Sequence, residues 1–146
     1  MKFPHLTLKT QLKGLIALCC LGVILMVSQI SWSSADAIAP HTLVPRLNTP
    51  DAPLVLDVRS EAEYAEGHIP GAINIPYRDI PNRLAELADF TTREVVVYCE
   101  VGVRAGIAEL ALEQAGFEQI RHLEGHMERW RQEDLPLVID AHPPMP

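Results

Sequence analysis

Lysine is absent from most of this chain. The three lysines, Lys2, Lys9 and Lys13, stand near the amino end, and residues 38–146 contain nine arginines against 18 acidic residues. That stretch has a formal net charge of −9 and no cluster of basic residues. Because nucleic-acid backbones are bound by clustered lysine and arginine, we expect no nucleic-acid partner.

The amino-terminal residues differ from the rest and predict a secretory signal peptide over residues 1–37. Lysines without acidic neighbours precede an apolar run at 15–30, and small residues follow in an A-x-A pattern ending at Ala37. A bilayer-spanning helix needs roughly 20 apolar residues, so we rank a membrane anchor second. Residues 38–140 would form a periplasmic or secreted domain, or one anchored to the inner membrane and facing outside if the leader is kept. Residues 141–146 are predicted to be a disordered tail.

Cysteine is almost as scarce as lysine. Cys19 and Cys20 fall in the predicted leader, so the exported part keeps Cys99 alone and cannot pair cysteines as disulfides. A single cysteine in an oxidising compartment risks oxidation unless it has a chemical role. A buried structural cysteine is the alternative, but the position of Cys99 beside Glu100 and Gly102, after an apolar run, favours a reactive one.

Apolar runs alternate with helical patterns along the domain. We predict strands at residues 42–44, 54–56, 72–75, 94–98 and 119–123, and helices at residues 79–87, 104–114 and 125–131. This alternation predicts an α/β fold with a mostly parallel sheet of about five strands and helices on both faces. Asp57 and Cys99 each follow a predicted strand, and ligands bind beyond the carboxyl ends of such strands. Both should therefore border one crevice.

Four motifs stand out within this pattern. They are L-D-V-R-S-E-A-E-Y-A-E-G-H-I-P-G-A-I-N-I-P at residues 56–76, Y-C-E-V-G-V-R-A at 98–105, A-G-F at 115–117 and L-E-G-H-M-E-R-W at 123–130. Together they resemble the single-domain rhodaneses, although G-H-I-P-G-A alone could be an ordinary turn. With the export signal, the chain is most similar to periplasmic rhodaneses of the phage-shock type. The implied fold is a small rhodanese-like domain.

The resemblance implies a thiosulfate sulfurtransferase that uses no cofactor. Cys99 would take the outer sulfur of thiosulfate or a persulfide donor as a persulfide, then pass it to cyanide or a thiol acceptor, including a thiol on a protein. The backbone of the loop and one cation would stabilise the anionic sulfur and bind substrate. The residues in this substrate-binding set are Glu100, Val101, Gly102, Val103 and Arg104.

Several neighbouring side chains modify this expectation. The carboxylate of Glu100 repels an anionic donor, whereas Arg104 could fork onto the oxyanion of thiosulfate. Asp57 and Arg59 are expected to brace the loop, with Arg59 paired to one of the acids at 61, 63 or 66. His126 stands where rhodaneses commonly carry a second glycine, so it could tune substrate choice or face water.

Other functions remain open from the sequence. Phosphatases and arsenate reductases of related fold have loops one residue longer than the four residues between Cys99 and Arg104. A non-catalytic persulfide-binding or redox-sensing sulfur carrier is the main alternative. No histidine pair has a ligand spacing with supporting cysteines, so we expect no metal. A membrane partner is expected only if the leader stays uncleaved.

Overall fold

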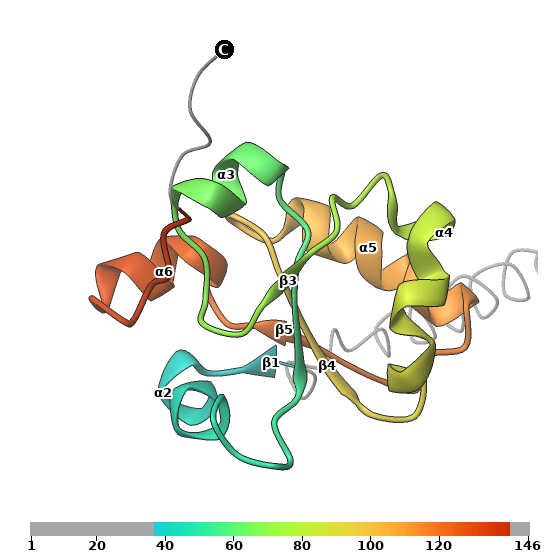
Figure 1. The fold of residues 1–146 in the computed structure, drawn as a ribbon, viewed down its shortest axis with the longest axis horizontal. Coiled ribbons are helices and arrows are strands. Elements are labelled where there is room, and N and C mark those ends of the chain that lie inside the picture. The colour runs from blue at the N-terminus through green and yellow to red at the C-terminus, as the bar shows by residue number, and fades with distance from the viewer. Residues whose placement is uncertain (1–36, 141–146) are drawn as a thin grey trace, which may run out of the picture. The chain divides into compact units, whose positions relative to one another are not determined.

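The apolar run at residues 95–97 forms the centre of a five-stranded parallel sheet (Figure 1). The computed structural model describes residues 37–140. The strand order is β1-β5-β4-β2-β3, and every pairing is parallel. The sheet and its flanking helices confirm the predicted α/β fold.

The elements follow one another in short connections. The strands are β1 (Ala37–Ile38), β2 (Leu54–Asp57), β3 (Ile73–Asn74), β4 (Glu94–Tyr98) and β5 (Gln119–Leu123). The helices are α2 (Pro40–Leu43), α3 (Glu61–Glu66), α4 (Ile80–Arg83), α5 (Val103–Gln114) and α6 (His126–Gln132), with 3₁₀ turns η2 (Val44–Arg46) and η3 (Leu84–Phe90). None of the helices described is long and apolar enough to cross a membrane.

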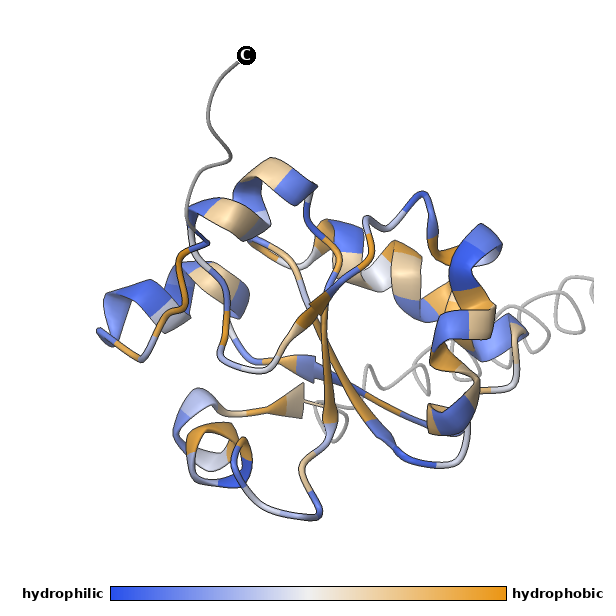
Figure 2. Ribbon diagram, in the orientation of Figure 1, coloured by the Kyte–Doolittle hydropathy of each residue, from blue (hydrophilic) through white to orange (hydrophobic). Residues whose placement is uncertain are grey.

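Alternate residues of the central strands pack into two separate apolar cores, one on each face of the sheet. Val95 and Val97 of β4 face a core shared with α5 and Leu87 of η3. Val96 and Tyr98 face the other core, which α2 and α6 cover. Figure 2 shows the apolar colours concentrated on the strands. Burial on both faces explains why β4 is an unbroken apolar run rather than an alternating one.

The structure corrects several predicted element boundaries. Residues 42–44 were expected to form a strand, but Pro40 begins a helix there because proline suits the first helical turn. The edge strand beside β5 is β1 instead. The predicted helix at 79–87 divides into α4 and η3, and α3 was not predicted. The apolar run at 15–30 and the tail at 141–146 lie outside the described residues.

The pairing of β2 with β4 aligns the ends of the two strands. Asp57 lies beside Tyr98 in this register, so the chain leaves both strands at the same, carboxyl-terminal end of the sheet. Asn74 of β3 donates to the carbonyls of Asp57 and Arg59 at 2.9 and 3.0 Å, which holds the third strand end in place. The aligned carboxyl ends of β2, β3 and β4 therefore lie where the crevice was predicted.

A fully buried ion pair lies directly below that edge. Both side chains of Asp57 and Arg59 are 0% exposed, with Nη2 of Arg59 2.6 Å from Oδ2 of Asp57. The second acceptor of Nη2 is the carbonyl of Gly67 at 2.8 Å. The sequence-based expectation that Arg59 pairs with an acid at 61, 63 or 66 is therefore wrong. Its guanidinium donates instead to the carboxylate of Asp57, two residues earlier in the chain.

Asp57→Ala is expected to lower the free energy of unfolding by about 3–5 kcal/mol, because it leaves a buried guanidinium without its counter-ion. Urea denaturation measures this loss. The exposed pair between Arg83 and Glu86 provides the control, since Glu86→Ala should leave the transition nearly unchanged. Equal effects of the two substitutions would contradict the structural role given to Asp57.

Candidate active site

Cys99 lies directly after β4, and only 1% of its surface is exposed. The backbone N–H of Gly102 points at its sulfur, with a nitrogen to Sγ distance of 3.1 Å. A hydrogen bond from an N–H group stabilises negative charge on the sulfur, because the donor's partial positive charge faces it. The loop therefore supplies a backbone donor that can stabilise negative charge on sulfur.

Two carbonyl groups of the loop accept hydrogen bonds from α6. The amide of Met127 donates to the carbonyl of Cys99 at 3.1 Å, and the amide of Glu128 donates to that of Glu100 at 3.2 Å. These two bonds also satisfy orphan donors in the first turn of α6. Figure 1 shows α3 and α6 at this end of the sheet, so two helices border the cysteine loop.

The loop leads into α5, whose first turn has no acidic residue and no capping side chain among the described residues. The positive end of this 12-residue helix is thus directed at the loop. Val101 and Val103 are 61% and 72% exposed, so their side chains face solvent while their backbone shapes the loop. This placement fits the predicted binding role of the loop backbone.

Gly102 allows the loop to close around the sulfur. Its φ of 110° is a conformation that residues with a side chain rarely adopt. A Cβ at this position would also lie 2.8 Å from Nε2 of His126, which is too close for unstrained contact. Both the backbone angle and the neighbouring ring therefore require glycine here.

Gly102→Ala should destabilise the loop, slow alkylation of Cys99 by iodoacetamide and lower the free energy of unfolding by about 1–3 kcal/mol. Gly106→Ala is the matched control, because Gly106 lies within α5 and no described atom is within 4 Å of its Cβ position. That change should leave alkylation unaffected and stabilise the helix slightly. The same alkylation rate in both variants would refute the role of Gly102.

Arg104 is ion-paired with Glu63. Its two terminal nitrogens each lie 2.7 Å from a carboxylate oxygen of Glu63. These hydrogen bonds lower the pKa of Glu63 to about 2 and raise the pKa of Arg104. Cys99 contributes less than Glu63 does to the raised pKa of Arg104. The structure thus brings Arg104 to the site, but already paired.

Sequence reasoning missed this role of Glu63, although a local signal was present. Ser60 and Glu63 form a capping box at the start of α3, in which Ser60 Oγ accepts from the amide of Glu63 at 3.3 Å. The S-x-x-E pattern predicts a helix start at this position. It does not reveal that the same carboxylate reaches Arg104, 41 residues further along the chain.

Glu100 also has cationic partners. Its carboxylate pairs with Arg131 of α6, and its second oxygen lies 3.7 Å from Nη1 of the buried Arg59. Nη1 is buried and has no hydrogen-bond partner within residues 37–140. The negative charge that was expected to repel an anionic donor is therefore partly compensated from both sides.

His126 packs against the loop instead of facing water. It is 9% exposed, and its Nδ1 accepts from the backbone amide of Cys99 at 3.4 Å. The ring edge of His122 approaches it at 5.7 Å between centroids. Burial, with a smaller contribution from His122, lowers the pKa of His126 to about 4. The neutral ring is therefore the form that the folded loop accommodates.

The free energy of unfolding should fall as the pH is lowered from 7 to 5. Unfolding releases the ring of His126, which then binds a proton below about pH 6.5, whereas the folded form resists protonation down to its own lower pKa. The group should therefore remove about 2 kcal/mol of unfolding free energy between pH 7 and pH 5. Urea denaturation across this range should show a shallower decline in His126→Asn, and an unchanged decline would contradict the assignment.

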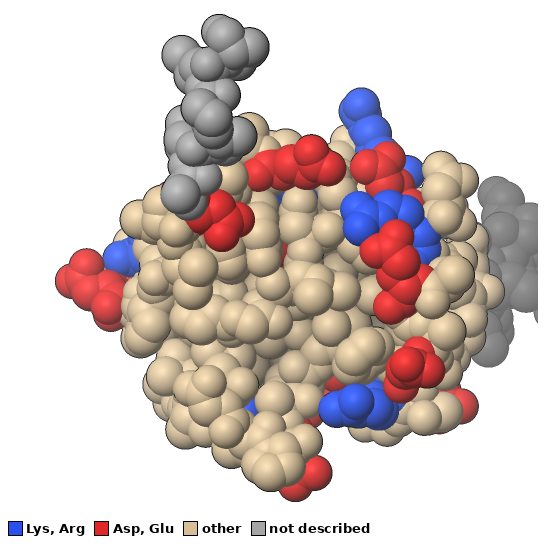
Figure 3. Space-filling view, viewed as in Figure 1, with Lys and Arg blue, Asp and Glu red and all other residues tan. Residues whose placement is uncertain are grey.

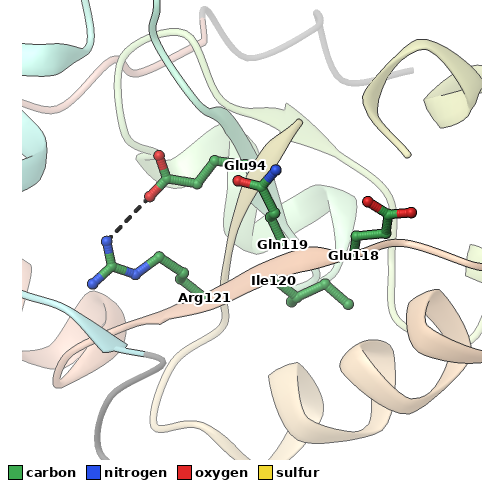
Figure 4. Close-up of a pocket in the computed structure, with 5 residues that line it drawn as sticks. All are labelled: Glu94, Glu118, Gln119, Ile120 and Arg121. Atoms are coloured by element: carbon green, nitrogen blue, oxygen red, sulfur yellow. Dashed lines mark hydrogen bonds and ion pairs between the residues drawn. The ribbon is translucent and has the colours of Figure 1, made fainter. Parts of the chain in front are cut away.

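A hollow lies at the opposite end of the strands. It is lined by Glu94, Glu118, Gln119, Ile120 and Arg121, at the amino ends of β4 and β5 (Figure 4). Nη1 of Arg121 donates to Glu94 at 3.2 Å, and Glu94 also pairs with Arg46. These ion pairs engage Glu94 and Arg121, and the hollow lies away from Cys99 because it is at the amino ends of parallel strands, whereas Cys99 follows a carboxyl end.

Comparison with known proteins now decides the family. Residues 39–133 match the rhodanese-like domain model. This chain belongs to the rhodanese family. The rhodanese is 36% identical over 103 residues to a sulfurtransferase from Allochromatium vinosum, which covers 70% of this chain and 94% of that protein. Sulfur transfer is therefore the general activity that its relatives support.

Solved structures agree on the fold. A rhodanese-related protein from Thermoplasma volcanium is 30% identical, with a TM-score of 0.62 over 71% of this chain and 98% of that one. A regulator from Mycobacterium tuberculosis, described as an HTH-type transcriptional regulator, is 38% identical over 117 residues. The rhodanese chain spans 50% of that regulator, so the domain also occurs within longer proteins.

Proposed function

We propose that this rhodanese is an exported sulfurtransferase that carries a sulfane sulfur on Cys99. The observation that carries the proposal is the N–H group of Gly102, directed at the sulfur within a loop that ends at the start of α5. This arrangement stabilises both a thiolate nucleophile and the anionic persulfide that follows. Thiosulfate or a persulfide is the donor class.

The reaction consists of two displacements at sulfur. The Cys99 thiolate attacks the outer sulfur of the donor, the donor's S–S bond breaks, and its electron pair leaves with sulfite when thiosulfate is used. The Cys99 persulfide is then attacked at its outer sulfur by cyanide or a thiolate. That bond formation releases the product and restores the Cys99 thiolate. Neither step requires a proton transfer from His126.

A thiol on another protein is a second class of acceptor. The exposure of Val101 and Val103 supports this, because it places apolar surface on the rim of the loop where a partner's side chains could pack. Cyanide and small thiols need no such surface. We propose both classes, with the small thiol as the simpler one.

A non-catalytic persulfide carrier or redox sensor is the alternative function. The observation that favours it is the burial of Cys99, which limits access to the sulfur. A phosphatase is less well supported, because its arginine must hold an oxyanion and Arg104 is engaged on both arms by Glu63. Turnover separates the first alternative from a sulfurtransferase.

We also propose a periplasmic location for this domain, after the phage-shock type of rhodanese that its motifs resemble. The support is the sequence pattern of residues 1–37, with its lysines, apolar run and A-x-A site. If that leader is retained, the domain would be anchored at the inner membrane and face outwards. In either case the sulfur acceptor would be met outside the cytoplasm.

Incubation with thiosulfate should add one sulfur atom to the wild-type protein and none to Cys99→Ala, as measured by intact-mass spectrometry. Cyanide should then remove the added sulfur and yield thiocyanate over repeated cycles, because the persulfide is an electrophile at its outer sulfur. Sulfur loading without repeated turnover would favour the carrier function. No adduct with any sulfane donor would contradict sulfur transfer at Cys99.

A further inference from the structure

The cations around Cys99 are already matched by acids. Arg104 has both arms on Glu63, and Arg59 is bound to Asp57. Arg131 is paired with Glu100, the residue next to the nucleophile. Within the described part of the chain, the immediate surroundings of the sulfur therefore combine positive and negative side chains in equal number.

A dianionic donor would meet the acid of one of these pairs. Thiosulfate carries two negative charges, and its sulfonate end could bind Arg104 only by displacing Glu63 or by using the remaining N–H groups beside the charge of Glu63. That carboxylate is fixed by two further bonds, because its Oε2 accepts from the amide and the hydroxyl of Ser60 at 3.0 and 2.7 Å. The pKa of Glu63 near 2 keeps it charged at neutral pH. A dianion therefore meets an electrostatic cost, whether it displaces Glu63 or binds beside it.

The rim of the site is apolar where such a donor would need polar contacts. Val101 and Val103 are the most exposed hydrophobic side chains of the loop and the start of α5. A donor whose leaving group is apolar can pack on them and remove that surface from water, which is favourable. Thiosulfate, with three charged or polar oxygens, gains nothing from this contact.

We propose that the site favours monoanionic sulfane donors with an apolar leaving group over thiosulfate, and that Glu63 sets this preference by compensating the positive charge of Arg104. The inference rests on the proposed sulfur transfer at Cys99 and names its donor class. Glu63 is a positioning residue in this scheme, since it acts through Arg104 and does not touch the reacting sulfur.

The reaction with such a donor balances in the same way as with thiosulfate. An organic thiosulfonate, R–SO₂–S⁻, is attacked at its outer sulfur by the Cys99 thiolate. The new S–S bond forms as the donor's S–S bond breaks, and the electron pair leaves with the sulfinate R–SO₂⁻. One negative charge stays on the persulfide and one on the leaving group, so no proton or external electron is needed.

Benzenethiosulfonate and thiosulfate form a matched pair of donors for the test. They share the same S–SO₂ linkage, but a phenyl group replaces one charged oxygen. The decisive quantity is the ratio of kcat/KM for the two donors, measured in wild type and in Glu63→Gln. Glutamine keeps the capping box of α3 but removes the charge that holds Arg104. Glu66→Gln, an exposed change of equal charge on the same helix, is the control.

Wild type is expected to use benzenethiosulfonate more efficiently than thiosulfate. Glu63→Gln should raise kcat/KM for thiosulfate by about tenfold, the gain expected from one charge-assisted hydrogen bond to the donor. Its effect on benzenethiosulfonate should stay within about twofold, since that donor's binding depends less on a free cation. The thiosulfate reaction of Glu63→Gln should also become more sensitive to salt. Glu66→Gln should leave the ratio as in wild type.

An unchanged donor ratio in a folded Glu63→Gln protein would overturn the inference while leaving sulfur transfer at Cys99 intact. Failure of both donors to load Cys99 in wild type would overturn the proposed function and this inference with it. Thermal unfolding of each variant establishes that it is folded. If Glu63→Gln is unstable, Glu100→Gln provides a second variant for the same measurement. It removes the negative charge beside the nucleophile and should shift the ratio towards thiosulfate.

Discussion

The parallel register of β2 against β4 is the constraint from which the site follows. It sets Asp57 beside Tyr98, so the chain that leaves β2 and the chain that leaves β4 meet at one edge of the sheet. Arg59 then lies below the loop of Cys99, and the apolar residues of both strands are buried on two faces at once. A shift of one residue would turn each side chain to the opposite core. The packing of the strands therefore determines where the site lies.

Within that frame, charge at the site is distributed in pairs. The acids outnumber the arginines over residues 38–146 by two to one, yet the loop itself is close to neutral because its acids lie against guanidinium groups. On the face shown in Figure 3, acidic and basic side chains are likewise interspersed. Stabilisation of an anionic sulfur then depends on backbone N–H groups and the start of α5, whose dipoles need no counter-ion.

The sequence predicted four of the five strands and the position of Cys99 directly after β4, because both depend on local patterns. The expectation that this position keeps Cys99 from being buried was wrong, since only 1% of its surface is exposed. An unbroken apolar run identifies β4, and the residue after it is necessarily at the edge of the sheet. The pairings of Arg59 and Arg104 could not be predicted, since several acids lay within reach and only the fold decides among them. His126 was noted as a departure from the family pattern. In the structure it contacts the amide of Cys99 from a backbone φ of 52°, which residue type alone does not indicate.

Glu63 connects α3 to the cysteine loop through Arg104. The same carboxylate closes the capping box with Ser60 and holds both arms of Arg104. The start of α3 and the start of α5 are therefore fixed to each other through one side chain. A ligand that took Arg104 away from Glu63 would also disturb the first turn of α3, and this coupling adds to the cost of displacement. Donor selection in this rhodanese is thus tied to the stability of a helix that does not touch the reacting sulfur.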